Sequence, residues 1–167
     1  MSVFAVPRLT WVRSRQVSLL SSGYSVDYDP RGVHQSMSNL FVYGTLLVPT
    51  VLESVAGSMY RSLRATLPGY ARFQVKDQVY PGIVARPGKY VDGLLYLTLD
   101  EQAMQRLDEF EAEVYERRSV RVQTRAHGLI DACAYVMAPH YEHLLSNYPW
   151  DLEKFKRHHL QNYLAKT

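Results

Sequence analysis

The chain has 167 residues, of which 47% are hydrophobic and 21% are charged, values typical of one globular domain with a single core. Its apolar runs are shorter than the roughly 18 residues of a membrane-spanning helix, which argues against a membrane protein. The net charge is +3, of which residues 1–38 contribute +2 and the remainder +1. Because the body has no basic stripe, nucleic-acid binding is not expected.

The first 36 residues differ in character from the rest. Residues 1–26 contain three arginines, several serines and no acidic residue, a composition typical of an organelle transit peptide. The pattern SNLFVYGTL directly after Met37 reads as the start of a domain, so residues 1–36 could instead follow from a wrongly assigned start codon, or form a folded or regulatory extension. In each case we expect this segment to be poorly ordered and residues 37–167 to form the folded domain.

The first half of the body predicts short strands and one short helix. Residues 39–46 predict a strand that ends in a tight loop at Gly44, and residues 48–56 a helix with Pro49 in its first turn. Residues 59–99 predict further strands separated by turns that contain Pro-Gly pairs: one or two strands over 59–73, then strands over 83–86 and 90–99, with turns at 68–69, 80–82 and 87–88.

A central helix is predicted next. Asp100 is a typical N-cap residue, and apolar residues follow it at helical spacing: Ala103, Met104, Leu107 and Phe110. Glu111 stands at the end of this helix.

The remaining chain predicts a hairpin and a last helix. Residues 115–125 alternate between valines and arginines, as a half-exposed strand does. A turn at residues 127–128 joins this strand to a second one over 130–137. A last helix over 151–165 is capped by Asp151 and carries four residues on one face: Leu152, Phe155, His159 and Tyr163. These elements predict an α+β domain built on a small mixed β-barrel, with one helix after the central strands and one C-terminal helix.

Cofactor and metal motifs are not evident. The sequence has no P-loop, dinucleotide fingerprint or nucleophile elbow. His140, Glu142 and His143 form a loose group without a third ligand at suitable spacing, so neither a metal nor another cofactor is expected. Cys133 is the only cysteine and is expected to be a buried, inert thiol. Because no intramolecular disulfide can form, a reducing compartment is favoured, and we expect a cytoplasmic protein unless residues 1–36 direct import into an organelle.

Three segments, taken together, carry the functional signal: FVYGTL at 41–46, YPGI at 80–83 and LDEFEAEVYERR at 107–118. With the VDGLLY strand before the helix, their order and spacing resemble the gamma-glutamylcyclotransferase-like family, closest to the branch of plant avirulence-induced proteins and gamma-glutamylamine cyclotransferases. The resemblance covers residues 39–138. It implies a cofactor-free enzyme that cyclises a γ-glutamyl group to 5-oxoproline and releases an amine or amino acid.

The resemblance also assigns residues. It places the proton-carrying role on Glu111, after the LD-x-F core, and contacts of the substrate with the main chain on the loop after the first strand: Tyr43, Gly44, Thr45 and Leu46. Ala112 stands where many members have glycine, which weakens the carry-over of local backbone geometry. Tyr80 and Tyr115 are expected to line the pocket, either as hydrogen-bonding groups or as packing residues.

The chemistry agrees with these residue types. Ring closure within one molecule needs positioning rather than a protein nucleophile, and a single carboxylate can take a proton from the α-amine and return it to the leaving amine. The helix C-terminus and the acidic neighbours Asp108, Glu109 and Glu113 disfavour ionisation of Glu111, and burial would add to this, so its pKa is expected to be raised. Gly44 allows the main chain to approach a ligand closely, and successive N–H groups there could bind a carboxylate or an oxyanion.

Several alternatives remain at this stage. Glu111 could belong to a solvated acidic helix end, and the chain could be a non-catalytic member that binds a small acidic ligand or a protein partner. A hydrolase or transferase that uses the same pocket on another amide is a third possibility. The sequence does not define the leaving group, the oligomeric state, or whether the last helix covers the pocket or packs on the barrel.

Overall fold

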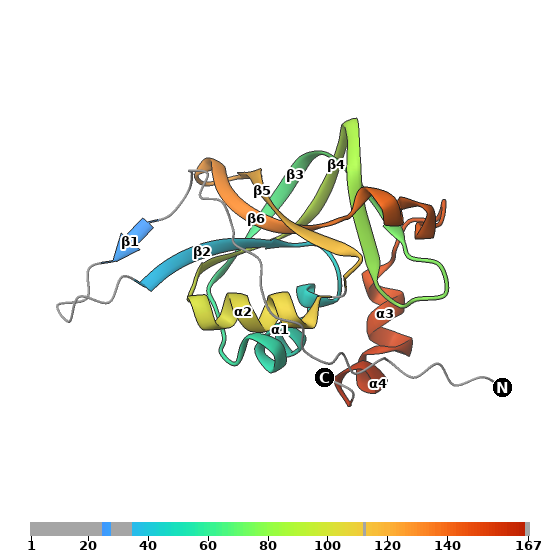
Figure 1. The fold of residues 1–167 in the computed structure, drawn as a ribbon, viewed down its shortest axis with the longest axis horizontal. Helices are drawn as coiled ribbons and strands as arrows, with labels where there is room; N and C mark the ends of the chain where they lie inside the picture. The colour runs from blue at the N-terminus through green and yellow to red at the C-terminus, as the bar shows by residue number, and fades with distance from the viewer. Residues whose placement is uncertain (1–24, 28–34, 112, 166–167) are drawn as a thin grey trace.

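The computed structural model describes residues 25–27, 35–111 and 113–165. Most of the predicted N-terminal extension, and Ala112, lie outside these ranges. Within them, β1 (Ser25–Asp27) pairs antiparallel with the start of β2 (Gln35–Val42), at the left of Figure 1. The first strand of the body therefore begins at Gln35 rather than at the predicted residue 39.

Five strands form a small closed barrel. Antiparallel pairing joins them in the order β2, β4 (Pro81–Leu99), β3 (Ser62–Gln74), β5 (Tyr115–Thr124) and β6 (Gly128–Met137). β6 then pairs with β2 in parallel, at Leu40 and Cys133. Closure removes the unpaired strand edges that an open sheet would expose. The predicted α+β domain built on a small mixed β-barrel is confirmed (Figure 1).

β4 is one long strand, where the sequence predicted two shorter strands separated by a turn, and β3 is a single strand, one of the two options predicted over residues 59–73. Gly69 and Gly88 do adopt left-handed backbone angles, with φ of 80° and 78°. The pairing nevertheless continues on both sides of them, after a register shift between Pro68 and Tyr70. A β-bulge accommodates the extra residues. The strands therefore bend at the Pro-Gly pairs, and the pairing of β3 with β4 resumes beyond them.

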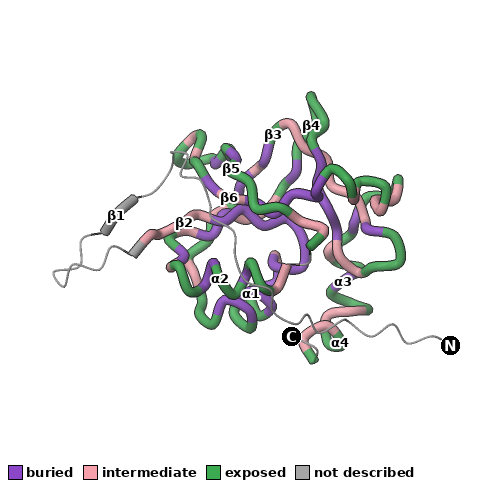
Figure 2. Tube along the Cα trace, in the orientation of Figure 1, coloured by how far each residue is buried: buried purple, intermediate pink, exposed green. Residues whose placement is uncertain are grey.

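Two helices lie side by side below the barrel in Figure 1: α1 (Pro49–Ala56) and α2 (Glu101–Phe110). Their apolar faces join strand residues in one of the buried clusters of the core, and the buried stretches of both helices are purple in Figure 2. α2 begins as predicted, since the Asp100 carboxylate accepts a hydrogen bond from the Ala103 N–H at 2.8 Å. Ala103, Met104 and Leu107 are buried, which confirms the predicted apolar stripe.

The Asp100 cap predicts a measurable contribution to stability. We expect Asp100→Ala to lower the free energy of unfolding by about 1 kcal/mol, because it removes the acceptor for both the Ala103 N–H and the Tyr60 hydroxyl. Asp100→Asn keeps an oxygen acceptor and should lose less. Urea denaturation of the two variants measures the difference, and equal losses would contradict a role for the cap.

The C-terminal part contains two helices in place of the single one predicted over 151–165. After η2 (Pro139–Leu144) the chain enters α3 (Leu152–His158), breaks at His159 with φ −127° and ψ −25°, and continues as α4 (Leu160–Leu164). Phe155 of α3 is 1% exposed and packs in the core. The break changes the chain direction, so that Tyr163 of α4 packs edge-on against Phe155, with 5.4 Å between ring centroids.

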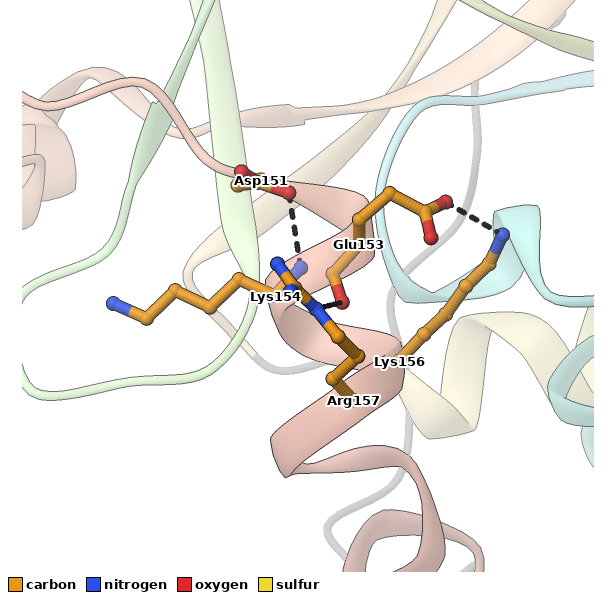
Figure 3. Close-up of polar contacts among 5 residues, drawn as sticks. All are labelled: Asp151, Glu153, Lys154, Lys156 and Arg157. Carbon is orange, nitrogen blue, oxygen red and sulfur yellow. Dashed lines mark hydrogen bonds and ion pairs between the residues drawn. The ribbon is translucent and has the colours of Figure 1, made fainter.

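The start of α3 carries the predicted cap. Figure 3 shows the Asp151 carboxylate accepting a hydrogen bond from the Lys154 N–H at 3.0 Å, and Lys156 paired with Glu153 at 3.0 Å. These side chains are exposed and form the solvent face of α3. The apolar side of the same helix faces the barrel.

Candidate active site

Glu111 lies where α2 ends. Its N–H still bonds to the Leu107 carbonyl at 3.0 Å, while its own ψ of 130° leaves the helical range. The apolar stripe of α2 anchors the helix in the core, and the side chain of Glu111 is half-buried. The packing of α2 therefore fixes the position of this carboxylate.

A cluster of tyrosines surrounds Glu111. Burial raises the pKa of five hydroxyls, and the charge of Glu111 raises each further: those of Tyr43, Tyr80, Tyr115, Tyr135 and Tyr163. They come from the loop after β2, the connection before β4, the start of β5, β6 and α4. We call these five residues the tyrosine cluster. The sequence predicted the first three as site residues but not the last two.

The pKa of Glu111 itself is strongly perturbed. Burial, and after it the charge of Asp108, raises the pKa of Glu111 to about 8. Asp108 lies nearly one helical turn earlier and is held by the Arg117 guanidinium at 2.9 Å and the Tyr135 hydroxyl at 2.8 Å. A carboxyl group with a pKa near neutrality can both accept and donate a proton at working pH.

Hydrogen bonds to main-chain carbonyls fix two members of the tyrosine cluster. The hydroxyl of Tyr43 donates to the carbonyl of Tyr135 at 2.6 Å, and that of Tyr115 donates to the carbonyl of Pro81 at 2.6 Å. The rings of Tyr80 and Tyr115 meet edge to face at 6.4 Å. Because the Tyr115 hydroxyl donates its proton to the Pro81 carbonyl, it does not donate that proton to the carboxylate of Glu111.

The turn formed by residues 43–46 brings two of the sequence motifs together. η1 (Thr45–Leu47) starts at Gly44, whose carbonyl accepts a hydrogen bond from the Leu47 N–H at 2.9 Å. A Cβ atom at Gly44 would lie 2.9 Å from the ring of Pro81, so the close approach of the YPGI segment requires glycine. The first N–H groups of a helix have no acceptor within it, so those at the start of η1 need a partner from outside the helix.

The side chains of this turn point away from solvent. Thr45 and Leu46 are buried, and Leu46 packs in the core. The carbonyl of Leu46 accepts a hydrogen bond from the Tyr96 hydroxyl at 3.4 Å. Any contact of Leu46 with a ligand would therefore run through its main chain.

Arg72 binds the main chain of this turn, and the sequence did not predict it as a site residue. Its guanidinium donates to the carbonyl of Tyr43 at 2.6 Å and lies over the Trp150 ring, 5.4 Å from the centroid. Burial lowers the pKa of Arg72, yet a guanidinium remains charged at any working pH. No local motif marks this residue, because its partners are distant in sequence.

Other candidates contribute little. Cys133 is half-buried in β6, and burial raises the pKa of its thiol, as an unreactive cysteine requires. Among the residues that the structure describes, no three or more His, Cys, Asp or Glu side chains are grouped to hold a metal ion. In the same part of the chain, the helices are too short or too polar to cross a membrane.

Comparison with known proteins places this chain in a family. Residues 40–156 match the family model described as Gamma-glutamyl cyclotransferase, AIG2-like. AIG2-like protein D of Arabidopsis thaliana is 31% identical over 134 residues, which cover 79% of this chain and 88% of that protein. AIG2-like protein B of the same plant is 28% identical over 133 residues, covering 77% of this chain and 74% of that protein.

Solved structures share the fold. A solution structure of an Arabidopsis thaliana protein aligns with a TM-score of 0.62 and 24% identity, covering 85% of this chain and 82% of that one. A structure titled Gamma-glutamyl cyclotransferase aligns with a TM-score of 0.54 and 20% identity, covering 78% and 85%. From the match over residues 40–156 and the similarity to AIG2-like protein D, the chain belongs to the gamma-glutamyl cyclotransferase, AIG2-like family.

Proposed function

We propose that this chain is a gamma-glutamyl cyclotransferase-type enzyme, in which Glu111 carries the proton during cyclisation of a γ-glutamyl group to 5-oxoproline. One observation carries the proposal: a carboxyl group with its pKa raised to about 8 stands inside the tyrosine cluster. A solvated acidic helix end would have no such surroundings. Membership of the family supports the reaction class.

The reaction needs one proton to move twice. The α-amine of the substrate attacks its own γ-carbonyl carbon, and a C–N bond forms that closes the five-membered ring. The Glu111 carboxylate takes the proton from this amine. It then gives the proton to the nitrogen of the leaving amine as the original amide bond breaks, so no net proton is consumed.

The remaining groups would position the substrate. The N–H groups of the turn at residues 43–46 suit the α-carboxylate or the developing oxyanion, and Arg72 adds positive charge behind this turn. Tyr80 and Tyr115, whose rings meet edge to face, would form a wall that limits access of water. This chemistry requires no cofactor, and on the evidence of the single cysteine we propose a reducing, cytoplasmic setting.

The test is a direct assay of product. The full chain and a version that starts at Met37 are incubated with γ-glutamyl amino acids, γ-glutamyl-ε-lysine and glutathione, and 5-oxoproline is measured by mass spectrometry. Product from at least one substrate is expected. If the folded protein yields none with any of them, the chain is better described as a binding member of the family.

The pH profile tests the role of Glu111. Since Glu111 must be ionised to accept a proton, we expect kcat/KM to fall about tenfold per pH unit below an apparent pKa near 8. The charge of Asp108 contributes to the raised pKa of Glu111, so Asp108→Asn should shift the acidic limb of the kcat/KM profile to lower pH. Glu109→Gln, at an exposed position of the same helix, is the control. A limb that stays in place in Asp108→Asn would contradict the coupling of the two carboxylates.

A further inference from the structure

The Tyr80 hydroxyl differs in its hydrogen bonding from the other hydroxyls of the tyrosine cluster. Each of the other four lies within 3.4 Å of an oxygen atom of the protein: those of Tyr43, Tyr115, Tyr135 and Tyr163. Among the residues that the structure describes, the Tyr80 hydroxyl has no such partner. In the same part of the chain, no buried side-chain oxygen or nitrogen lacks a hydrogen bond. The Tyr80 hydroxyl therefore lies where solvent or a ligand can reach it.

Hydrogen bonds hold the main chain around Tyr80 in place. The carbonyls of Val79, Tyr80 and Pro81 each accept one. The donors are the indole N–H of Trp150 at 2.8 Å, the N–H of Val75 at 3.2 Å and the hydroxyl of Tyr115 at 2.6 Å. The Tyr80 ring also meets the Tyr115 ring edge to face at 6.4 Å. The position of the Tyr80 hydroxyl is thus fixed before any ligand binds, which is the condition for an effective electrostatic catalyst.

Tyr80 and Glu111 lie near each other. Burial, and after it the charge of Glu111, raises the pKa of the Tyr80 hydroxyl. The hydroxyl therefore keeps its proton at working pH and remains a hydrogen-bond donor. The carboxyl group of Glu111 also has no hydrogen-bond partner among the described residues. A hydroxyl that can donate and a carboxyl group that can move a proton are thus both available to one ligand.

The proposed reaction creates a charge that Glu111 does not stabilise. When the α-amine nitrogen attacks the γ-carbonyl carbon, the π electrons of the C=O bond move onto the oxygen, which becomes an oxyanion. This oxygen reforms the C=O bond as the bond to the leaving amine breaks. A donor fixed beside the oxyanion stabilises it more than it stabilises the substrate, and removing one such donor typically lowers kcat about 10²- to 10³-fold.

We infer that Tyr80 is a further catalytic residue, whose hydroxyl donates a hydrogen bond to the γ-carbonyl oxygen as this atom becomes the oxyanion. The inference rests on the proposed cyclotransferase function, and it leaves the N–H groups of the turn at residues 43–46 to the α-carboxylate. Two explanations compete with it. Tyr80 could act only as a packing residue beside Tyr115, or its hydroxyl could act on the ionisation of Glu111.

Removal of the hydroxyl alone tests the inference. Tyr80→Phe should lower kcat about 10²-fold and change KM by less than about fivefold, because an oxyanion accepts a stronger hydrogen bond than a neutral carbonyl does. The melting temperature should stay close to that of the wild type, since no protein group loses a partner. Tyr70→Phe, in β3 and outside the tyrosine cluster, is the matched control and should keep the wild-type kcat. An unchanged kcat in Tyr80→Phe would overturn the inference.

A pair of substrates locates the hydrogen bond. γ-Glutamyl-n-butylamide and its γ-thioamide differ in one atom, and sulfur is a weak hydrogen-bond acceptor. The loss of kcat in Tyr80→Phe should therefore be about tenfold smaller on the thioamide than on the amide. The acidic limb of the kcat/KM profile should stay near pH 8 in this variant. Equal losses on the two substrates would overturn the inference, and so would a limb that shifts with the substitution.

Binding distinguishes failure of this inference from failure of the proposed function. The lactam oxygen of 5-oxoproline is the former γ-carbonyl oxygen, and NMR titration measures the affinity of each protein for this compound without turnover. If the wild type forms no 5-oxoproline but binds it about threefold more tightly than Tyr80→Phe does, the cyclotransferase function fails and the contact with Tyr80 stands. In that case equal affinities, or no binding to either protein, overturn the contact as well.

Discussion

Glu111→Gln is expected to reduce the rate of 5-oxoproline formation by about 10²- to 10⁴-fold, the usual contribution of a positioned acid–base group. Glutamine has the shape and polarity of the protonated carboxyl group but cannot carry the proton between the two amines. Substrate binding should change less than the rate, because the turn at residues 43–46 is untouched. Rates from single-turnover mass spectrometry, with KM from the dependence on substrate concentration, separate the two effects.

Glu111→Gln should also change how the free energy of unfolding depends on pH, because the Glu111 carboxyl group is buried. Its pKa is raised from 4.5 to about 8 in the folded protein, so the folded state keeps a proton that the unfolded state releases in this range. The stability from this proton is complete below pH 4.5 and is lost as the pH rises through 8. Glu111→Gln should therefore match the wild type near pH 4.5 and be more stable by a few kcal/mol at pH 9.

Thermal unfolding of both proteins across this pH range provides the measurement. Glu109→Gln, at an exposed position two residues earlier, should behave as the wild type in both assays. Undiminished product formation by a folded Glu111→Gln protein would remove Glu111 from the mechanism. A constant difference in stability across the pH range would show that this carboxyl group titrates normally.

Gly93→Ala is expected to cause a large loss of stability. A Cβ atom at Gly93 would collide with the main-chain carbonyl oxygen of Val42 and lie 2.7 Å from a ring carbon of Phe41. Neither neighbour can move freely, since Val42 belongs to the β2–β4 pairing and Phe41 is 1% exposed. Overpacking of this kind costs about 1–3 kcal/mol, and more where the main chain must shift.

The consequence should extend to the site, because Tyr43 and Gly44 directly follow Val42. We expect the folded fraction of Gly93→Ala to be less active than the wild type, in addition to the loss of stability in urea. Asp92→Ala changes the preceding, exposed residue and removes one exposed hydrogen bond from Thr66, so it should lower the free energy of unfolding by no more than about 1 kcal/mol. If Gly93→Ala had the same stability in urea and the same activity as Asp92→Ala, the close packing of Gly93 in β4 against Val42 and Phe41 in β2 would be contradicted.

The sequence by itself determined the elements whose signals are local. The N-cap and apolar stripe of α2, the start of α1 at Pro49 and the β5–β6 hairpin all follow from residues a few positions apart. The same holds for the place of Glu111 at the end of α2. Capping, helical spacing and strand alternation act over one or two turns or a single strand, so they can be read without the partners of each element.

Only the tertiary structure decided which distant groups meet. The continuity of β3 and β4 depends on their pairing with each other, which outweighs the local turn preference of their Pro-Gly pairs. Tyr135 and Tyr163 join the site because β6 closes the barrel and the chain breaks at His159. Tyr163 and Thr45 are 118 positions apart in the chain. Packing of apolar faces chooses such neighbours by the shape and burial of the whole core, and no short stretch of sequence carries that information.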